Sequence, residues 1–270
     1  MSPHGTHRPR KPLRLAALTV SGLMALWVIA ELYSRWPSGA VAPPISLRPG
    51  AQDLIVLVHG SFGREEPTLV ALESRLATLA ASRQSTQIVR YRWAPWSDNI
   101  FRAHSHGTRI GAQLGHQLAT AFKPGAVQTP RAMTLHLIAH SAGAYVLDPL
   151  CERLRQDLGA SAGRVFIRMT FLDPIGLRGL LERGWGARNL GRCADDAEAW
   201  INTDDPAPAT DRWLQHAWNI DVTAAQGHER FSGGGHRWPV QYFAEQVSAA
   251  DLELAISRRD VQPPGRGERR

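Results

Sequence analysis

One stretch of the chain, residues 135–144, constrains its fold more than any other. It reads LHLIAHSAGA. An apolar run of this kind is typical of a buried strand, and the residues that follow it have the character of a helix. The sequence therefore places Ser141 at a sharp turn between a strand and a helix, with its hydroxyl above the edge of a sheet. A serine that simply caps an ordinary helix is the alternative interpretation.

Apolar runs and helical periodicities alternate along the rest of the chain. The predicted strands cover residues 53–58, 87–93, 133–139, 164–172, 199–202 and 216–222. The predicted helices cover residues 67–81, 100–122, 142–158 and 239–256. This alternation predicts an α/β fold, with a mostly parallel central sheet and helices on both faces. A chain of 270 residues with 43% hydrophobic residues can form one large domain of this kind.

The N-terminal segment predicts a membrane anchor or a signal peptide. Residues 15–30 are an apolar run that follows a basic flank. The small residues that signal cleavage would need, at 40–42, lie ten residues beyond this run, which favours an uncleaved anchor. The basic flank would remain on the cytoplasmic side, with the body of the protein outside the inner membrane. Secretion after cleavage, and a buried soluble helix, are the alternatives.

Four parts of the chain differ in composition. We expect a basic flank and anchor in residues 1–34, a proline-rich tether in 35–52, one folded domain in 53–257 and a basic disordered tail in 258–270. The two ends carry the whole formal charge of +7, because residues 15–257 are formally neutral. The folded domain thus has no basic field that would attract nucleic acid, and we expect no nucleic-acid partner.

Candidate catalytic residues occur in the order serine, acid, histidine. A serine hydroxyl becomes a useful nucleophile when a base takes its proton and an acid orients that base. Asp173 directly follows the predicted strand 164–172, and His236 follows three glycines just before the last predicted helix. Asp205 is the second choice for the acid and His228 for the base.

An oxyanion hole requires two backbone N–H groups that point at one spot. We expect one from Ala142, which follows the nucleophile, and one from Ser61, in the loop after the first predicted strand. Phe62 is the second choice for the latter donor. Together with Ser141, Asp173 and His236, these groups predict a site for acyl chemistry at the carboxyl edge of the sheet.

Short motifs in this chain resemble those of the α/β-hydrolase lipases, most closely the animal (pancreatic-type) lipase group. They are His59-Gly60, the turn at 140–143, Leu172-Asp173-Pro174, the segment 199–204, and His236 with Tyr242-Phe243. The resemblance implies serine-ester hydrolysis and assigns the triad to Ser141, Asp173 and His236. Ala139 replaces the first glycine of the usual turn motif, and the disulfides and lipid-binding domain of the animal enzymes are absent. Ester chemistry is therefore better supported than lipid substrates.

These features predict a carboxylic-ester hydrolase, an esterase or lipase, that works through an acyl-enzyme and uses no cofactor. An acyltransferase with the same triad and a catalytically silent binding module are the alternatives.

A metal site at His104, His106 and His116 is disfavoured because positions i and i+2 lie on different faces of a helix. Residues 175–197 are a candidate lid over a small-molecule or lipid ester. Cys151 and Cys193 could form a disulfide or remain thiols, and the sequence does not indicate an oligomeric state.

Overall fold

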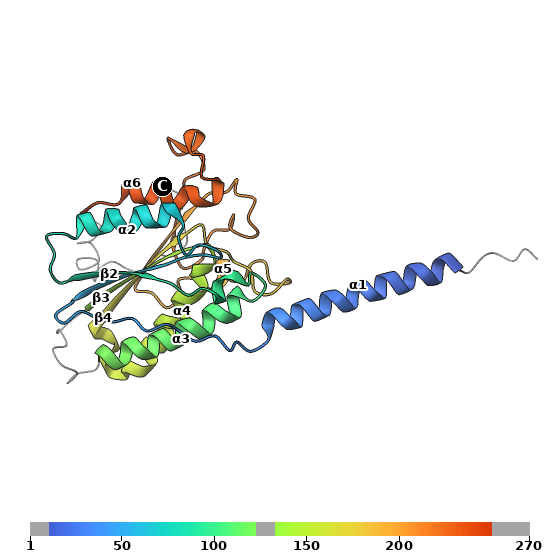
Figure 1. Ribbon diagram of the computed structural model, residues 1–270, viewed down its shortest axis with the longest axis horizontal. Helices are drawn as coiled ribbons and strands as arrows, with labels where there is room; N and C mark the ends of the chain where they lie inside the picture. Colours follow the sequence, from blue (N-terminus) through green and yellow to red (C-terminus); the bar gives the residue numbers. More distant parts are fainter. Residues whose placement is uncertain (1–10, 123–132, 250–270) are drawn as a thin grey trace, which may run out of the picture.

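The computed structural model describes residues 11–122 and 133–249, and a six-stranded sheet forms its centre (Figure 1). All strand pairs are parallel, and their order is β2-β1-β3-β4-β5-β6. The strands are β1 (Asp53–Val58), β2 (Thr86–Tyr91), β3 (Met133–His140), β4 (Val165–Leu172), β5 (Asp196–Ile201) and β6 (Trp218–Asp221). The predicted α/β fold is confirmed, and the sheet is parallel throughout.

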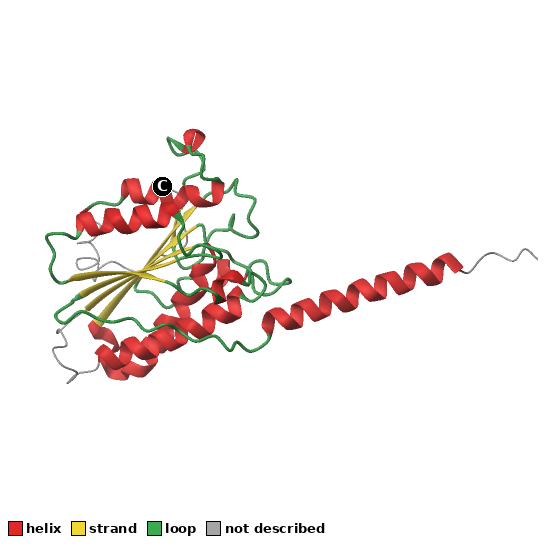
Figure 2. Cartoon of the chain, viewed as in Figure 1, coloured by secondary structure: helices red, strands yellow, loops and turns green. Residues whose placement is uncertain are grey.

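Helices cover both faces of this sheet (Figure 2). One layer holds α2 (Pro67–Leu79) and α6 (Trp238–Gln246), and the other holds α3 (Ala103–Phe122), α4 (Ala144–Leu158) and α5 (Trp185–Asn189). Short 3-10 helices are η1 (Trp96–Asp98), η2 (Ser141–Gly143), η3 (Gly159–Arg164), η4 (His228–Arg230) and η5 (Gly235–Arg237).

The two-sided cover explains why the strands read as unbroken apolar runs. Successive side chains of a strand point to opposite faces of the sheet. On β1, Leu54, Val56 and Val58 belong to the core under α3 and α4, whereas Ile55 and Leu57 belong to the core under α2 and α6. Side chains on both faces of a central strand are therefore buried, which favours apolar residues along its length.

Several predicted boundaries were wrong, by up to ten residues. The last helix was expected to reach residue 256 but α6 ends at Gln246, because Val247 turns to an extended conformation and is buried in the core. β5 begins at Asp196, three residues early, because pairing with β4 continues to Arg168. The predicted disordered tail, 258–270, lies outside the described residues.

The proline-rich segment expected to be an extended tether packs against the domain. Ala40 and Ala42 are buried in the core on the α3 side. The Ala42 N–H donates to Gln113 Oε1 at 2.7 Å, and the Tyr91 hydroxyl donates to the Pro43 carbonyl at 3.1 Å. The segment is thus part of the folded domain.

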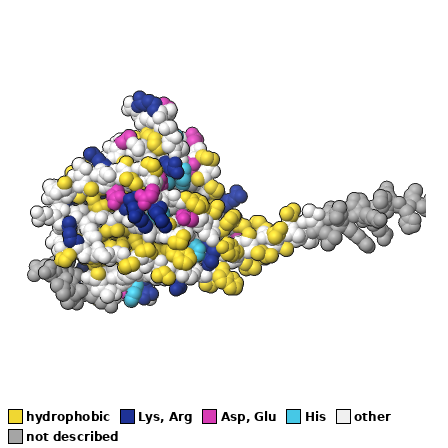
Figure 3. All heavy atoms as spheres, viewed as in Figure 1, with side chains coloured by type: hydrophobic (Ala, Val, Ile, Leu, Met, Phe, Trp, Pro, Cys, Tyr) yellow, Lys and Arg dark blue, Asp and Glu magenta, His cyan; other side chains and the backbone are white. Residues whose placement is uncertain are grey.

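Helix α1 (Lys11–Arg35) projects away from the domain (Figure 1). Its described C-terminal part exposes large apolar side chains (Figure 3). Its last turns contact loops of the domain. Glu31 Oε2 accepts a hydrogen bond from the Leu180 N–H at 2.6 Å, and Arg35 forms an ion pair with Glu182 at 3.0 Å. In the part of the chain that the structure describes, no helix has both the length and the apolar character needed to cross a membrane.

A disulfide joins Cys151 on α4 to Cys193, just before β5, with 5.9 Å between the Cα atoms. The sequence left this pairing open. The bond closes a loop between residues 42 positions apart. Closing such a loop restricts the unfolded chain and so stabilises the folded state.

Removal of this disulfide should lower the free energy of unfolding by about 2–4 kcal/mol. The variant is Cys151→Ala combined with Cys193→Ala, and the measurement is urea denaturation beside the oxidised wild type. Wild-type protein in reductant should approach the stability of the variant. An identical denaturation midpoint for the variant and the oxidised protein, or two free thiols in the purified protein, would contradict the bond.

Candidate active site

Ser141 lies at the strained corner between β3 and helix η2. Its φ angle is +55°, and it is 5% exposed. A residue other than glycine in this region costs on the order of 1–3 kcal/mol and is typical of functional sites. The turn at Ser141 is therefore maintained by the surrounding fold, as a strand-to-helix nucleophile turn requires.

Two glycines permit the close packing around Ser141. A Cβ atom on Gly60 would lie 2.7 Å from Ser141 Cβ, and one on Gly143 would lie 2.5 Å from the Val58 carbonyl oxygen. The loop after β1 therefore passes directly against the serine. Ala139, at the place of the first glycine of the motif, is fully buried and pairs with Phe171 of β4.

His236 lies on helix η5 and contacts two carboxylates through one nitrogen. Its Nδ1 atom is 2.8 Å from Asp173 Oδ2 and 2.7 Å from Asp205 Oδ2. The structure thus brings together the predicted base and both the first and the second choice for the acid. This convergence follows from topology, because Asp173 and Asp205 come after the adjacent parallel strands β4 and β5.

Each acid is held by further hydrogen bonds. Asp173 is fully buried with φ at +47°, and its Oδ1 accepts the Asn202 N–H at 2.9 Å. Asp205 is 8% exposed, and its Oδ2 accepts the Thr210 hydroxyl at 3.1 Å. Both carboxylates are therefore oriented toward His236 by the loops that carry them.

The closeness of these three groups shifts their pKa values. Burial raises the pKa of Asp173 to about 6. Burial would also raise the pKa of Asp205, but its hydrogen bonds to His236 and Asp173 outweigh burial and lower the value to about 2. Burial alone would lower the pKa of His236, whereas its hydrogen bonds to the two carboxylates raise it to about 9.

Ser141 and His236 are neighbours without a direct hydrogen bond between their side chains. The His236 ring lies 4.7 Å, centre to centre, from the ring of His140, which directly precedes Ser141. Because Nδ1 faces the carboxylates, Nε2 is the ring nitrogen that remains for the serine. Catalytic hydrogen bonds are often long without substrate and tighten when it binds.

The two candidates for the loop donor of the oxyanion hole differ in their hydrogen bonding. The Ser61 N–H makes no hydrogen bond to any described residue, and Ala142 follows Ser141 directly. The Phe62 N–H, the second choice, donates to Asp98 Oδ1 at 3.1 Å and is therefore occupied.

A buried ion pair that the sequence did not predict holds the loop of His236. Glu66 Oε2 lies 2.8 Å from His140 Nδ1, and His140 Nε2 donates to the His236 carbonyl oxygen at 2.9 Å. The two partners of the His140 ring, a carboxylate and a carbonyl, both offer acceptor oxygens. Glu66 precedes Pro67 at the start of α2, where no motif identifies it as a partner of the distant His140.

Histidines elsewhere in the described part of the chain have structural partners. His59 bonds to the Gly60 carbonyl and accepts the Trp93 N–H, and His136 bonds to the Thr170 hydroxyl in the core, as expected. The second choice for the base, His228, bonds to the Thr223 carbonyl and stacks on Trp238.

The three histidines of α3 are engaged separately. His104 packs edge-on against Trp185, His106 bonds to Ser38, and His116 bonds to Asp157. His104, His106 and His116 therefore do not converge on one point. The candidate lid segment begins beside the nucleophile, where the Ile175 N–H donates to the Ser141 carbonyl at 3.4 Å. The Tyr145 hydroxyl on α4 donates to the Leu177 carbonyl, and the segment continues through the short helix α5.

One histidine and two carboxylates can also coordinate a metal ion, and Asp173, Asp205 and His236 are such a group. Around a four-coordinate Zn²⁺ the ligand atoms are about 3.4 Å apart, since bonds of about 2.1 Å point to the corners of a tetrahedron. The separations of 2.7 and 2.8 Å at His236 Nδ1 are shorter and match hydrogen bonds.

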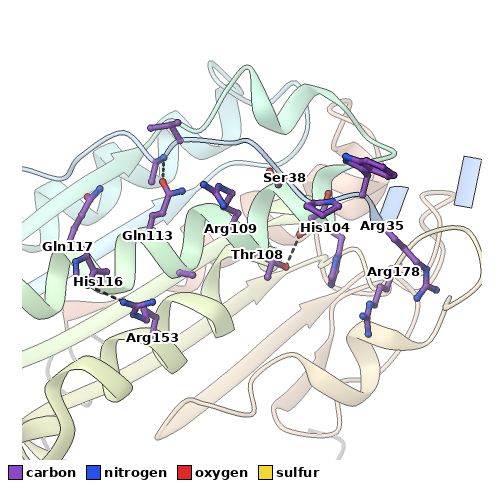
Figure 4. Close-up of a pocket in the computed structure, with 16 residues that line it drawn as sticks. Arg35, Ser38, His104, Thr108, Arg109, Gln113, His116, Gln117, Arg153 and Arg178 are labelled. Atoms are coloured by element: carbon purple, nitrogen blue, oxygen red, sulfur yellow. Dashed lines mark hydrogen bonds between the residues drawn. The ribbon is translucent and has the colours of Figure 1, made fainter. Parts of the chain in front are cut away.

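A cavity of about 750 Å³ lies elsewhere, between α3 and the segment at 35–42 (Figure 4). Arginines line it, but Arg35 is paired with Glu182 and Arg153 with Asp157. None of Ser141, Asp173 and His236 contributes to its lining. We therefore base the function on the serine corner rather than on this cavity.

The parts at the carboxyl edge of the sheet can support nucleophilic acyl transfer: a hydroxyl on a strained turn, an oriented imidazole, buried carboxylates and a free backbone N–H. No known protein-family model matches the chain, and a comparison with curated proteins finds no match.

Proposed function

We propose that this chain is an α/β-hydrolase that cleaves carboxylic esters, with Ser141 as nucleophile, His236 as base and Asp173 as orienting acid. The observation that carries the proposal is the strained turn of Ser141 beside a histidine whose Nδ1 is held at 2.8 Å by the buried Asp173. A parallel sheet with the nucleophile after its central strand β3 supports this assignment.

The reaction proceeds in two steps. Ser141 Oγ attacks the ester carbonyl carbon while His236 Nε2 accepts its proton, and the N–H groups of Ser61 and Ala142 bind the resulting oxyanion. The imidazolium then donates its proton to the leaving alcohol, which yields an acyl-enzyme and free alcohol. Water attacks the acyl-enzyme with His236 as base, releases the carboxylic acid and restores the serine. Loss of one oxyanion donor costs about 3 kcal/mol in a serine protease.

We also propose that α1 attaches the domain to a membrane and that the domain lies outside the cytoplasm. Large apolar side chains of α1 are exposed by 60% or more, among them Leu23, Met24, Leu26, Ile29 and Leu32. Water disfavours such a surface, and it fits a lipid phase. The disulfide between Cys151 and Cys193 is consistent with an oxidising compartment.

A fluorophosphonate probe tests the proposed chemistry, because it labels serines that are activated as nucleophiles. We expect one equivalent of label, located on Ser141 by mass spectrometry, and its absence from unfolded protein. Turnover of p-nitrophenyl esters should fall in parallel with labelling. Product analysis with added acceptor alcohols separates hydrolysis from acyl transfer. A folded protein that neither reacts with the probe nor cleaves any ester of the series would be a silent binding module.

A further inference from the structure

His236 Nδ1 faces two carboxylates where a serine–histidine–acid triad needs one, with a hydrogen bond to Asp173 and an ion-pair contact with Asp205. A single N–H can make only one strong hydrogen bond, yet Asp173 Oδ2 and Asp205 Oδ2 lie at almost the same distance from this nitrogen. Both carboxylates are largely removed from water, at 0% and 8% exposure. Two carboxylates held this close repel each other, so the arrangement requires a positive charge or a proton between them.

We propose that Asp205 is a second positioning residue of the triad, which shares the charge of the His236 imidazolium with Asp173, so that turnover is fastest at alkaline pH. The proposal rests on the proposed ester hydrolysis and adds a residue and a pH range to it. Asp205 acts through His236 and does not itself touch the substrate.

The other charged groups around His236 do not cancel the effect of the two carboxylates. From β3, the ring of His140 lies tilted beside that of His236, and its Nδ1 contacts Glu66 from the start of α2. From the same loop as His236, Arg237 Nε lies 3.7 Å from Glu66 as well. Asp173 and Asp205 are therefore the groups in direct contact with His236, and their combined effect is the raised pKa described above.

The sign of the pH dependence follows from the role of the base. An imidazolium cannot accept the serine proton, so activity appears only as pH rises through the pKa of His236. Removal of one carboxylate makes the imidazolium less stable and moves this rise to lower pH. The remaining carboxylate still selects the tautomer with a proton on Nδ1, so much of the plateau rate should survive.

The test compares pH profiles of kcat/KM for the wild type, Asp205→Asn, Asp173→Asn and the double variant. Asp204→Asn is the matched control, because this neighbouring side chain is exposed. We expect the rise in activity to move down by at least one pH unit in Asp205→Asn, with a plateau within about 100-fold of the wild type. The double variant should lose about 10⁴-fold in kcat, as when the acid of a serine protease is replaced by asparagine. Asp204→Asn should match the wild type.

Two results would overturn the proposal that Asp173 and Asp205 share the role of the triad acid. If Asp205→Asn has the profile of the wild type, Asp205 has no part in the triad. If Asp205→Asn alone loses as much as the double variant, the acid is not shared. Circular dichroism checks that each variant is folded.

A readout independent of turnover is the titration of His236 by NMR in ¹³C-histidine-labelled protein, with the signal assigned by its loss in His236→Gln. We expect the wild-type imidazole to titrate clearly above pH 7.5, and an ordinary value near 6.5 would overturn the proposal even if no Asp205 variant folds. An elevated titration in a protein without ester turnover would reject the proposed function and leave the shared carboxylates in place.

Discussion

Ser141→Ala should lower kcat for short acyl esters by on the order of 10⁶, the loss found when the nucleophile of a serine protease is removed. The hydroxyl oxygen is the only atom lost, and without it no acyl-enzyme can form. Folding should be retained, because the Ser141 side-chain hydroxyl supports no other described element through a hydrogen bond. Alanine also keeps the Cβ atom that packs against Gly60.

The measurement is the rate of p-nitrophenyl ester hydrolysis, together with labelling by the fluorophosphonate probe. Ser74→Ala is the matched control, since Ser74 is exposed on α2 and bonds only to the Val70 carbonyl of its own helix. It should hydrolyse esters and react with the probe as the wild type does. Near-normal turnover in Ser141→Ala would end the assignment of this serine as the nucleophile.

Glu66→Gln should lower the free energy of unfolding by about 3–5 kcal/mol, the usual effect of removing one partner of a buried ion pair. The variant leaves His140 buried at 3% exposure without its carboxylate. His140 also holds the His236 carbonyl, so the loop of the catalytic base should loosen at the same time. We therefore expect a lower kcat in addition to lower stability.

The stabilising effect of Glu66 should depend on pH in a defined direction. Burial would raise the pKa of this carboxyl group, but attraction to His140 and hydrogen bonds from His140 and Thr68 lower it from 4.5 to about 2. A lowered pKa in the folded state gives stability that is present above about pH 4.5 and is lost as pH falls toward 2. The difference between wild type and Glu66→Gln should thus shrink over that range.

Urea denaturation at several pH values measures this difference. Glu65→Gln is the control, because Glu65 has a 61% exposed side chain and pairs with Arg90 and Arg92 at the surface. Exposed ion pairs contribute about 0–1 kcal/mol. If Glu66→Gln were no less stable than Glu65→Gln at pH 7, the buried pair would not support the site.

The local sequence determined the fold class and the edge of the sheet where the candidate site lies. Central strands such as β1 and β3 are covered on both faces, so their sequences are continuous apolar runs that can be recognised without a structure. Residues that directly follow such strands emerge at one edge when the strands are parallel. Ser141 and Asp173 both follow strands in this way, and the structure places His236 beside Asp173.

The tertiary structure decided which side chains meet at this edge. Asp205 contacts His236 because β5 lies next to β4 and because the loop after β5 brings Asp205 back toward Asp173. The sequence around Asp205 does not predict this course of the loop. Glu66 and His140 are 74 positions apart, and no local pattern links them. The fit of Ala40 against α3 and the closure between Cys151 and Cys193 also depend on packing between distant segments. A periodic pattern determines which face of an element is buried, but the partner of a side chain depends on how the elements pack, and that packing is a property of the whole chain.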